Sequence, residues 1–200
     1  MSVTEIIRKE ISQRQAGDVF LLKDFSHFGT EDSVKKALSR MCLSGEIIRL
    51  GKGVYCIPNV DTHFGFGNVY PAQEKIAQAV AQSEGLSIIP TAEFAMNALN
   101  LTTQIQTNTV FLTDGCRRHI KLDGYKGNGI TFIHCSNRRL FEIKNRRMLL
   151  IILSMKHIGE NNLSVAHMDL IRGHLQNVSL QDYLHDIQLA PVWIQRKLMS

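Results

Sequence analysis

The first apolar pattern of the chain has the spacing of a helix. It consists of Val3, Ile6, Ile7 and Ile11, which recur at helical spacing and form one apolar stripe. Ser2 and Glu5 have the spacing of a capping box at its start. We therefore predict a helix that ends at about Gln15, followed by a short apolar strand at 19–22 and a short second helix.

A second helical stripe follows Thr30, which has the residue type of an N-cap and is followed by two acidic residues that favour a helix start. The buried face of this helix is predicted to contain Val34, Ala37, Leu38 and Met41. The face left for solvent carries Ser33, Lys35, Lys36, Ser39 and Arg40. Gly45 is predicted to end the helix.

A β-hairpin is predicted next, with strands at 46–50 and 54–57 joined by the turn Gly51-Lys52-Gly53, in which both glycines can adopt positive φ. Helix, strand, helix, helix and hairpin follow one another in the order of a winged helix-turn-helix, which we predict for residues 1–58. Such a helix fits the DNA major groove, and Lys52 at the hairpin tip can reach the backbone. The alternative is a solvated helix with an ordinary hairpin, in a fold that mediates protein contacts.

Residues 59–71 lack a clear period and are predicted to be a linker. Residues 72–200 are predicted to form a mixed α/β domain with a helical C-terminal part, so that the fold class is α+β. Its helices are expected at 72–83, after Pro90 with Phe94, Ala95, Ala98 and Leu99 on one side, and at 143–157, 164–175, 180–187 and 192–199. Its strands are expected at 86–89, 109–113, 118–122 and 130–135.

The net charge of +5 and the pI of about 9.1 suit a polyanionic partner. The charge is uneven, because residues 1–59 carry nine Lys and Arg against seven Asp and Glu, whereas residues 117–147 carry nine against two. This second segment suggests either a solvated face or an additional phosphate-binding surface. The residues of the predicted secondary basic surface are Arg117, Arg118, Lys121, Arg138, Arg139, Arg146 and Arg147.

The four cysteines form no CxxC pair and lie in apolar or strand-like runs, which predicts reduced and mostly buried thiols in a cytoplasmic protein. The N-terminal segment carries charges throughout and does not resemble a signal peptide. The apolar run at 149–153 is too short to span a bilayer, so no membrane association is expected.

Candidate chemistry in the sequence is sparse. Cys116, His119, His134 and Cys135 could in principle approach one metal ion, but adjacent residues of a strand point to opposite faces, so no metal site is predicted. The chain has no P-loop, GxGxxG, GxSxG or HExxH motif, and its carboxylates are scattered. We therefore predict no catalysis and no cofactor. A hydrolase that uses His119 or His134 as a base is the enzymatic alternative.

Two stretches of the chain resemble the AbiEi-type antitoxins of bacterial type IV toxin-antitoxin systems. The first is DSVKKALSRMCLSGEIIRLGKGVYCIP, which is similar to the winged-helix pattern of that family. The second and more specific one is IIPTAEFAMNALNLTTQIQTNTVFLTDGCRRHIKL. The chain departs from the family pattern at Asn100 and Gln106, where glycine and proline are common.

The resemblance implies a transcriptional repressor that binds inverted repeats in its own promoter and takes part in phage defence. It also implies that the C-terminal part neutralises a nucleotidyl transferase toxin without a stable complex. The positions that match the family pattern and would contact DNA are Lys35, Lys36, Arg40, Arg49, Lys52 and Tyr55. The alternative function is a stand-alone winged-helix regulator whose second domain senses a ligand or partner.

Overall fold

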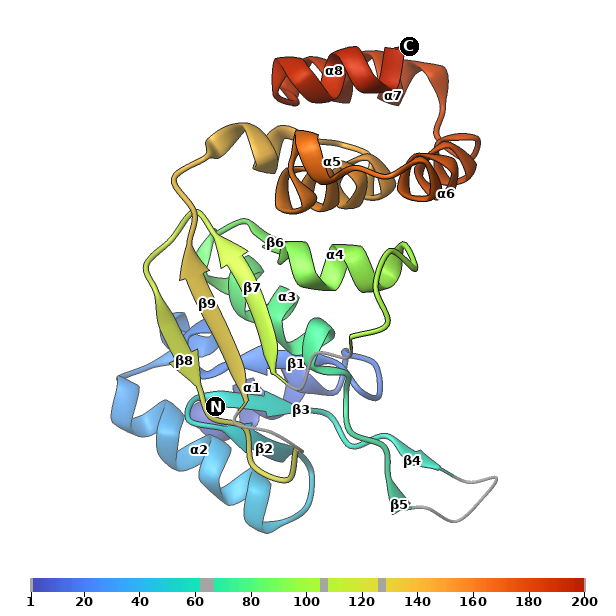
Figure 1. Cartoon of the computed structure of the whole chain (residues 1–200). Helices are drawn as coiled ribbons and strands as arrows, with labels where there is room; N and C mark the ends of the chain where they lie inside the picture. The colour runs from blue at the N-terminus through green and yellow to red at the C-terminus, as the bar shows by residue number, and fades with distance from the viewer. Residues whose placement is uncertain (1, 62–66, 105–107, 126–128, 200) are drawn as a thin grey trace. The chain divides into compact units, whose positions relative to one another are not determined.

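The structure of the chain, a computed structural model, describes residues 2–61, 67–104, 108–125 and 129–199. The fold class is α+β, as predicted from the sequence (Figure 1). Within the described residues, no helix combines the length and the apolar character needed to cross a bilayer.

The chain forms two compact units. Unit 1 contains Met1–Leu86 with Arg118–Thr131, and unit 2 contains Ser87–Arg117 with Phe132–Ser200. This division differs from the predicted domains of residues 1–58 and 72–200, because a helix at 73–84 and the segment 118–131 pack with the N-terminal residues. The two units are described separately below.

Unit 1 is built from short helices and strands, and its elements are α1 (Val3–Ile11), β1 (Val19–Leu21), the 3-10 helix η1 (Leu22–Phe28), α2 (Glu31–Leu43), β2 (Ile48–Gly51), β3 (Val54–Cys56), β4 (Val60–Asp61), β5 (Gly67–Asn68), α3 (Gln73–Glu84) and β8 (Arg118–Ile120). The first three strands form an antiparallel sheet in the order β1-β3-β2. The predicted order of elements up to residue 58 is therefore confirmed.

Both predicted helix starts are confirmed by their caps. Ser2 accepts a hydrogen bond from Glu5 N, and the Glu5 carboxylate accepts one from Ser2 N, which completes a capping box. Thr30 caps α2 by accepting from Ser33 N at 3.3 Å. These contacts are local, which is why the sequence alone could reveal them.

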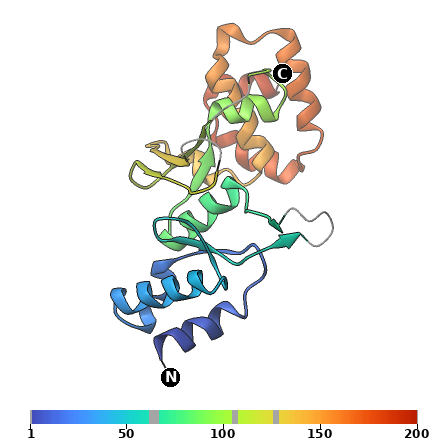
Figure 2. The same ribbon diagram turned by 90° about the horizontal axis from the view of Figure 1, so that it is seen from below.

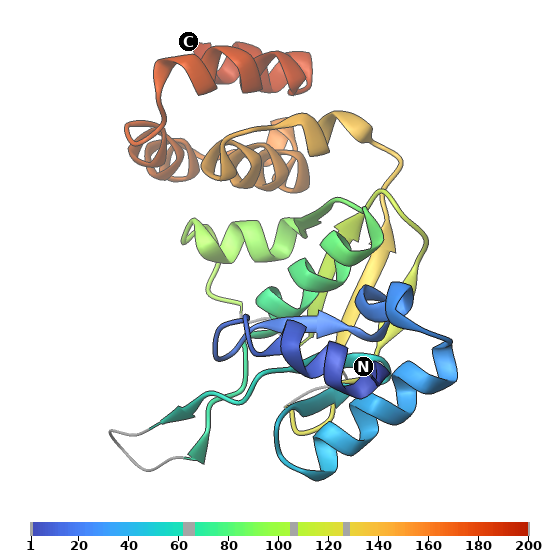
Figure 3. The ribbon, with the colours of Figure 1, turned by 180° about the vertical axis from the view of Figure 1, so that it is seen from behind.

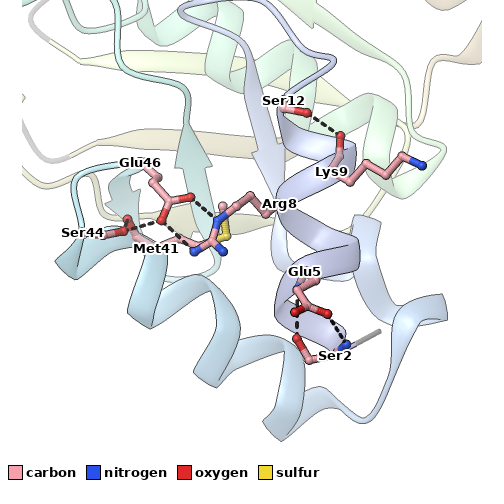
Figure 4. Close-up of polar contacts among 8 residues, drawn as sticks. All are labelled: Ser2, Glu5, Arg8, Lys9, Ser12, Met41, Ser44 and Glu46. Carbon is pink, nitrogen blue, oxygen red and sulfur yellow. Dashed lines mark hydrogen bonds and ion pairs between the residues drawn. The ribbon is translucent and has the colours of Figure 1, made fainter.

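The helices α1 and α2 lie side by side in unit 1 (Figures 2 and 3). The predicted apolar faces of both helices meet in one core, which contains Ile7, Ile11, Phe20, Phe25, Val34, Ala37, Leu38, Met41, Ile47 and Tyr55. At the edge of this core, Arg8 of α1 binds Glu46 through two hydrogen bonds of 2.7 and 2.9 Å (Figure 4). Such a two-point contact sets the orientation of α1 relative to the end of α2.

The turn of the β2–β3 hairpin differs from the predicted one in the backbone conformation of its first glycine. Only Gly53 has positive φ, at 75°, whereas Gly51 belongs to strand β2. A Cβ at Gly51 would lie 2.5 Å from the carbonyl oxygen of Lys121. Glycine is thus required at residue 51 because another backbone comes close, not because of its φ angle.

We expect Gly51→Ala to lower the free energy of unfolding by about 1–3 kcal/mol, because one of two backbones must move. The measurement is urea unfolding together with amide hydrogen exchange at Asp123, whose N–H donates to Leu50 O at 2.7 Å. Gly173→Ala is the matched control, since nothing lies within 4 Å of the added Cβ and the site is helical. Unchanged stability and exchange at Asp123 would contradict this account of Gly51.

The predicted linker 59–71 contains a two-stranded antiparallel sheet, in which Val60 pairs with Asn68 and Asp61 with Gly67. This hairpin projects from the three-stranded sheet of unit 1 (Figure 1). Residues 62–66 lie outside the described part. The segment is therefore more regular than its sequence suggests, because two strands of two residues each are too short to show an alternating pattern.

Unit 2 contains most of the helices of the chain, and its elements are β6 (Ile88–Pro90), α4 (Ala92–Ala98), β7 (Thr109–Thr113), the 3-10 helices η2 (Arg138–Glu142), η3 (Glu160–Asn162) and η4 (Ile187–Leu189), α5 (Arg146–Ile158), α6 (Val165–Leu175), α7 (Leu180–Asp186) and α8 (Val192–Met199). Strand β9 (Ile130–His134) begins in unit 1 and continues in unit 2. In unit 2 its sheet neighbour is β7, which pairs antiparallel with β6.

Helix α5 is the centre of unit 2, with every residue from Met148 to Met155 buried. The predicted start at Ile143 is wrong, because the helix begins at Arg146. Asn145 caps it by accepting from the N–H groups of Arg147 and Met148.

Helix α4 packs against α5 with Ala95 and Leu99, which are buried as predicted. Phe94 and Ala98 were predicted on the same side but are exposed. Asn100 follows with φ 56°, a left-handed conformation that glycine and asparagine tolerate best. Gln106 lies outside the described residues.

Candidate nucleic-acid interface

Helix α2 presents a polar face built largely from the residues predicted for it. Lys35, Lys36, Ser39 and Arg40 are exposed, while the apolar positions of the helix lie in the core of unit 1. Among the described residues, no ion pair involves Lys36 or Arg40. Two cations one helical turn apart are therefore free to meet phosphate groups.

Two other residues of this face have partners inside α2. Lys35 Nζ lies 2.6 Å from the Glu31 carboxylate, and this hydrogen bond raises the pKa of Lys35 above its usual value. The Ser33 hydroxyl donates to Thr30 O at 2.7 Å as part of the helix cap. Lys35 and Ser33 are therefore less available for a ligand than Lys36 and Arg40.

The β2–β3 hairpin adds two exposed cations. Arg49 Nε donates to Gly51 O at 3.2 Å, and Lys52 stands in the turn before Gly53. Tyr55 differs from them, because it is only 7% exposed and its ring stacks on Phe20 at 6.0 Å between centroids. Burial also raises the pKa of the Tyr55 phenol. The predicted DNA contact of Tyr55 is corrected, and we assign its side chain to the core.

A hollow of about 620 Å³ in unit 1 joins residues from both predicted basic surfaces. Arg49 and Lys52 line it together with Arg118 and Lys121 of the predicted secondary surface. Lys23 and Glu84 also line it, and neither was predicted as a site residue. They are far from the other residues in sequence, so no local pattern could have identified them.

The sequence profile of the family described as "Family of unknown function (DUF6088)" matches residues 6–183, which include nearly all of both units. The chain belongs to the DUF6088 family. No curated protein and no solved structure matches the chain.

The rest of the predicted secondary surface of the DUF6088 chain belongs to unit 2. Arg117, Arg138 and Arg139 are exposed there. Arg146 and Arg147, at the start of α5, line a second hollow of about 440 Å³. The seven residues of the predicted secondary surface are thus divided between the two units, because Arg118 and Lys121 belong to unit 1. That they form a single surface stays a prediction.

All four cysteines of the DUF6088 chain are free thiols. Cys56 is buried, Cys42 and Cys135 are half-buried, and Cys116 is exposed, which corrects the prediction for that residue. Burial raises the pKa of Cys56 to about 11, so this thiol is protonated and unreactive at neutral pH.

The two histidines that were weighed as metal ligands and catalytic bases, His119 and His134, have hydrogen-bond partners. His119 Nδ1 lies 3.0 Å from Thr131 Oγ1, and His134 Nδ1 lies 2.8 Å from Gly115 O. In the part of the chain that the structure describes, no three His, Cys, Asp or Glu side chains are grouped as metal ligands.

Proposed function

We propose that the protein binds double-stranded DNA through α2 and the β2–β3 hairpin, as a winged helix-turn-helix. The observation that carries this proposal is that exposed cations stand on both elements, with Lys36 and Arg40 on α2 and Lys52 at the hairpin turn. The element order up to β3 and the sheet order β1-β3-β2 also support it. In such modules one helix enters the major groove while the hairpin contacts the backbone.

The dimensions of α2 suit this role. Its 13 residues span about 20 Å, and its apolar face is buried against α1, so that only the polar face is open to a groove. The bidentate contact of Arg8 with Glu46 holds the end of α2 without using any of its outward cations (Figure 4). A groove-binding helix supported in this way loses little conformational freedom on binding.

We further propose that the protein is a cytoplasmic autorepressor and antitoxin that counters a nucleotidyl transferase toxin. The support is the AbiEi resemblance of the stretch from Ile88 to Leu122, in which Asn100 has the backbone conformation expected where that family has glycine. The antitoxin part predicts a nucleotidyl transferase gene beside the gene of this protein, and it is tested by co-expressing the full chain with the product of such a gene. Restored growth supports the antitoxin role, and continued toxicity at matched expression contradicts it.

The DNA-binding part is tested by fluorescence anisotropy of the full chain on its own upstream DNA and on a shuffled duplex, from about 50 to about 200 mM salt. We expect tighter binding to the upstream DNA that persists at the higher salt concentration. Equal and steeply salt-dependent binding to both duplexes would show a generic basic surface and contradict a repressor that reads its promoter.

A further inference from the structure

The hollow in unit 1 is formed by four segments that are distant in sequence. They are the junction of β1 and η1, the β2–β3 hairpin, the end of α3, and residues 118–123. The residues that line it are Leu21, Leu22, Lys23, Arg49, Lys52, Gly53, Val54, Glu84, Arg118, His119, Ile120, Lys121 and Asp123. All of them belong to unit 1.

Backbone hydrogen bonds hold the walls of this hollow in place. Leu22 N donates to Gly53 O at 3.0 Å on one side of the hairpin, and Asp123 N donates to Leu50 O at 2.7 Å on the other. Gly51 also forms an antiparallel bridge with Leu122. The hollow is therefore preformed, which lowers the entropic cost of binding a ligand.

The charge around the hollow favours an anion. Five cationic side chains line it against two carboxylates, and one of these carboxylates, Glu84, is already paired with Arg118 at 2.5 Å. This pair also fixes the guanidinium group of Arg118 at the wall. A concave surface with an excess of one charge concentrates the field, so that phosphate groups are the expected occupants.

The floor of the hollow is apolar, which narrows the class of ligand. Leu21 and Val54 are 8% and 2% exposed, and the half-buried Leu22 and Ile120 extend this surface. A duplex backbone offers only phosphate and sugar to such a floor, whereas a nucleotide adds an aromatic base. The volume of about 620 Å³ lies within the usual range for small-molecule sites.

We propose that this hollow binds a nucleotide, with the phosphate chain among the cations and the base on the apolar floor. Because Arg49 and Lys52 also belong to the proposed DNA surface, bound nucleotide competes with DNA for them. The competition rests on the proposed function, whereas nucleotide binding itself does not. The hollow thus makes the repressor responsive to a phosphorylated small molecule.

Isothermal titration calorimetry of the full chain tests the site without DNA. The probes are ATP and GTP, inorganic tripolyphosphate, which lacks the base, and adenosine, which lacks the phosphates. We expect at least one nucleotide to bind about tenfold or more tightly than tripolyphosphate, and adenosine to bind too weakly to detect. Absence of nucleotide binding overturns the proposal, and equal affinity for tripolyphosphate overturns the assignment of a nucleotide.

The double variant Lys23→Ala/Lys121→Ala tests the location of the site, because both side chains are exposed and neither belongs to α2 or the hairpin. Nucleotide affinity is expected to fall by about tenfold or more, while Lys9→Ala, which removes an exposed lysine from α1, leaves it unchanged. Equal affinity in both variants would assign the nucleotide to another surface and overturn the proposal.

Anisotropy on upstream DNA then tests the competition. Nucleotide is expected to weaken DNA binding by the wild type and to have about tenfold less effect on the Lys23→Ala/Lys121→Ala variant. If nucleotide binds but does not change the affinity for DNA, the proposed competition between nucleotide and DNA is overturned, and the nucleotide site is still supported. If the protein binds nucleotide but does not bind upstream DNA, the proposed DNA-binding function is overturned and the proposed nucleotide site is still supported.

Discussion

The Lys36→Ala/Arg40→Ala double variant is expected to bind upstream DNA roughly tenfold to a hundredfold more weakly than the wild type, if each side chain makes one charge-assisted contact to phosphate. Both side chains are exposed on α2, and no ion pair among the described residues competes for them. Loss of two phosphate contacts should also reduce the slope of log affinity against log salt by about 2. Anisotropy across a salt series measures both quantities.

Two single variants serve as controls for this experiment. Lys35→Ala is expected to have a smaller effect than Lys36→Ala, because Lys35 is already paired with Glu31 on the same helix. Lys9→Ala removes a lysine from α1 that extends away from α2 and should leave the slope unchanged (Figure 4). An unchanged slope in the Lys36→Ala/Arg40→Ala variant would place α2 outside the DNA interface.

Replacement of Asp186 by alanine is expected to destabilise unit 2 by about 3 kcal/mol. Asp186 is completely buried, and its carboxylate accepts hydrogen bonds from the backbone N–H groups of Lys144 and Asn145 at 3.0 and 2.8 Å. His185 Nδ1 lies 2.8 Å from the same carboxylate. Alanine would remove this buried carboxylate and leave two backbone N–H groups without their acceptor just before α5 begins.

Urea unfolding followed by the fluorescence of Trp193 measures this effect, because it is the only tryptophan in the chain and packs against the core of unit 2. Asp186→Asn keeps the shape and one acceptor oxygen, so an intermediate loss of stability is expected. Asp169→Ala on the exposed side of α6 is the matched control and should change the stability by less than about 0.5 kcal/mol. A similarly small change for Asp186→Ala would mean that the carboxylate does not hold the start of α5.

Predictions from sequence succeeded where the determining contacts are local. The caps at Ser2 and Thr30 and the buried faces of α1 and α2 depend on residues within two turns of each other. The predicted start of α5 was wrong although its cap is local. Residues 144–147 are polar, and Asn145 caps the helix by accepting from the N–H groups of Arg147 and Met148. Only the contact of Asp186 with the backbone at 144 and 145 joins positions more than 40 residues apart, which no window of sequence contains.

Some residues of the candidate site could likewise be identified from the sequence, and others could not. Lys36, Arg40 and Lys52 could be predicted, because helical period and turn chemistry determine which side chains face outward. Tyr55 could not be assigned to the core, since its strand is too short to show which face meets α1 and α2. The hollow could not be predicted either, because its cations come from positions 23, 49, 52, 118 and 121.

By itself, the sequence determined the α+β class, the order of elements up to β3, the helix caps and the basic character of the α2 face. Each of these follows from side-chain periodicity or from hydrogen bonds between near neighbours. The tertiary structure alone decided that residues 118–131 pack with unit 1, that Gly51 must lack a Cβ, and that cations from distant segments surround one hollow. These features depend on backbones that are far apart in the chain and meet only when it is folded.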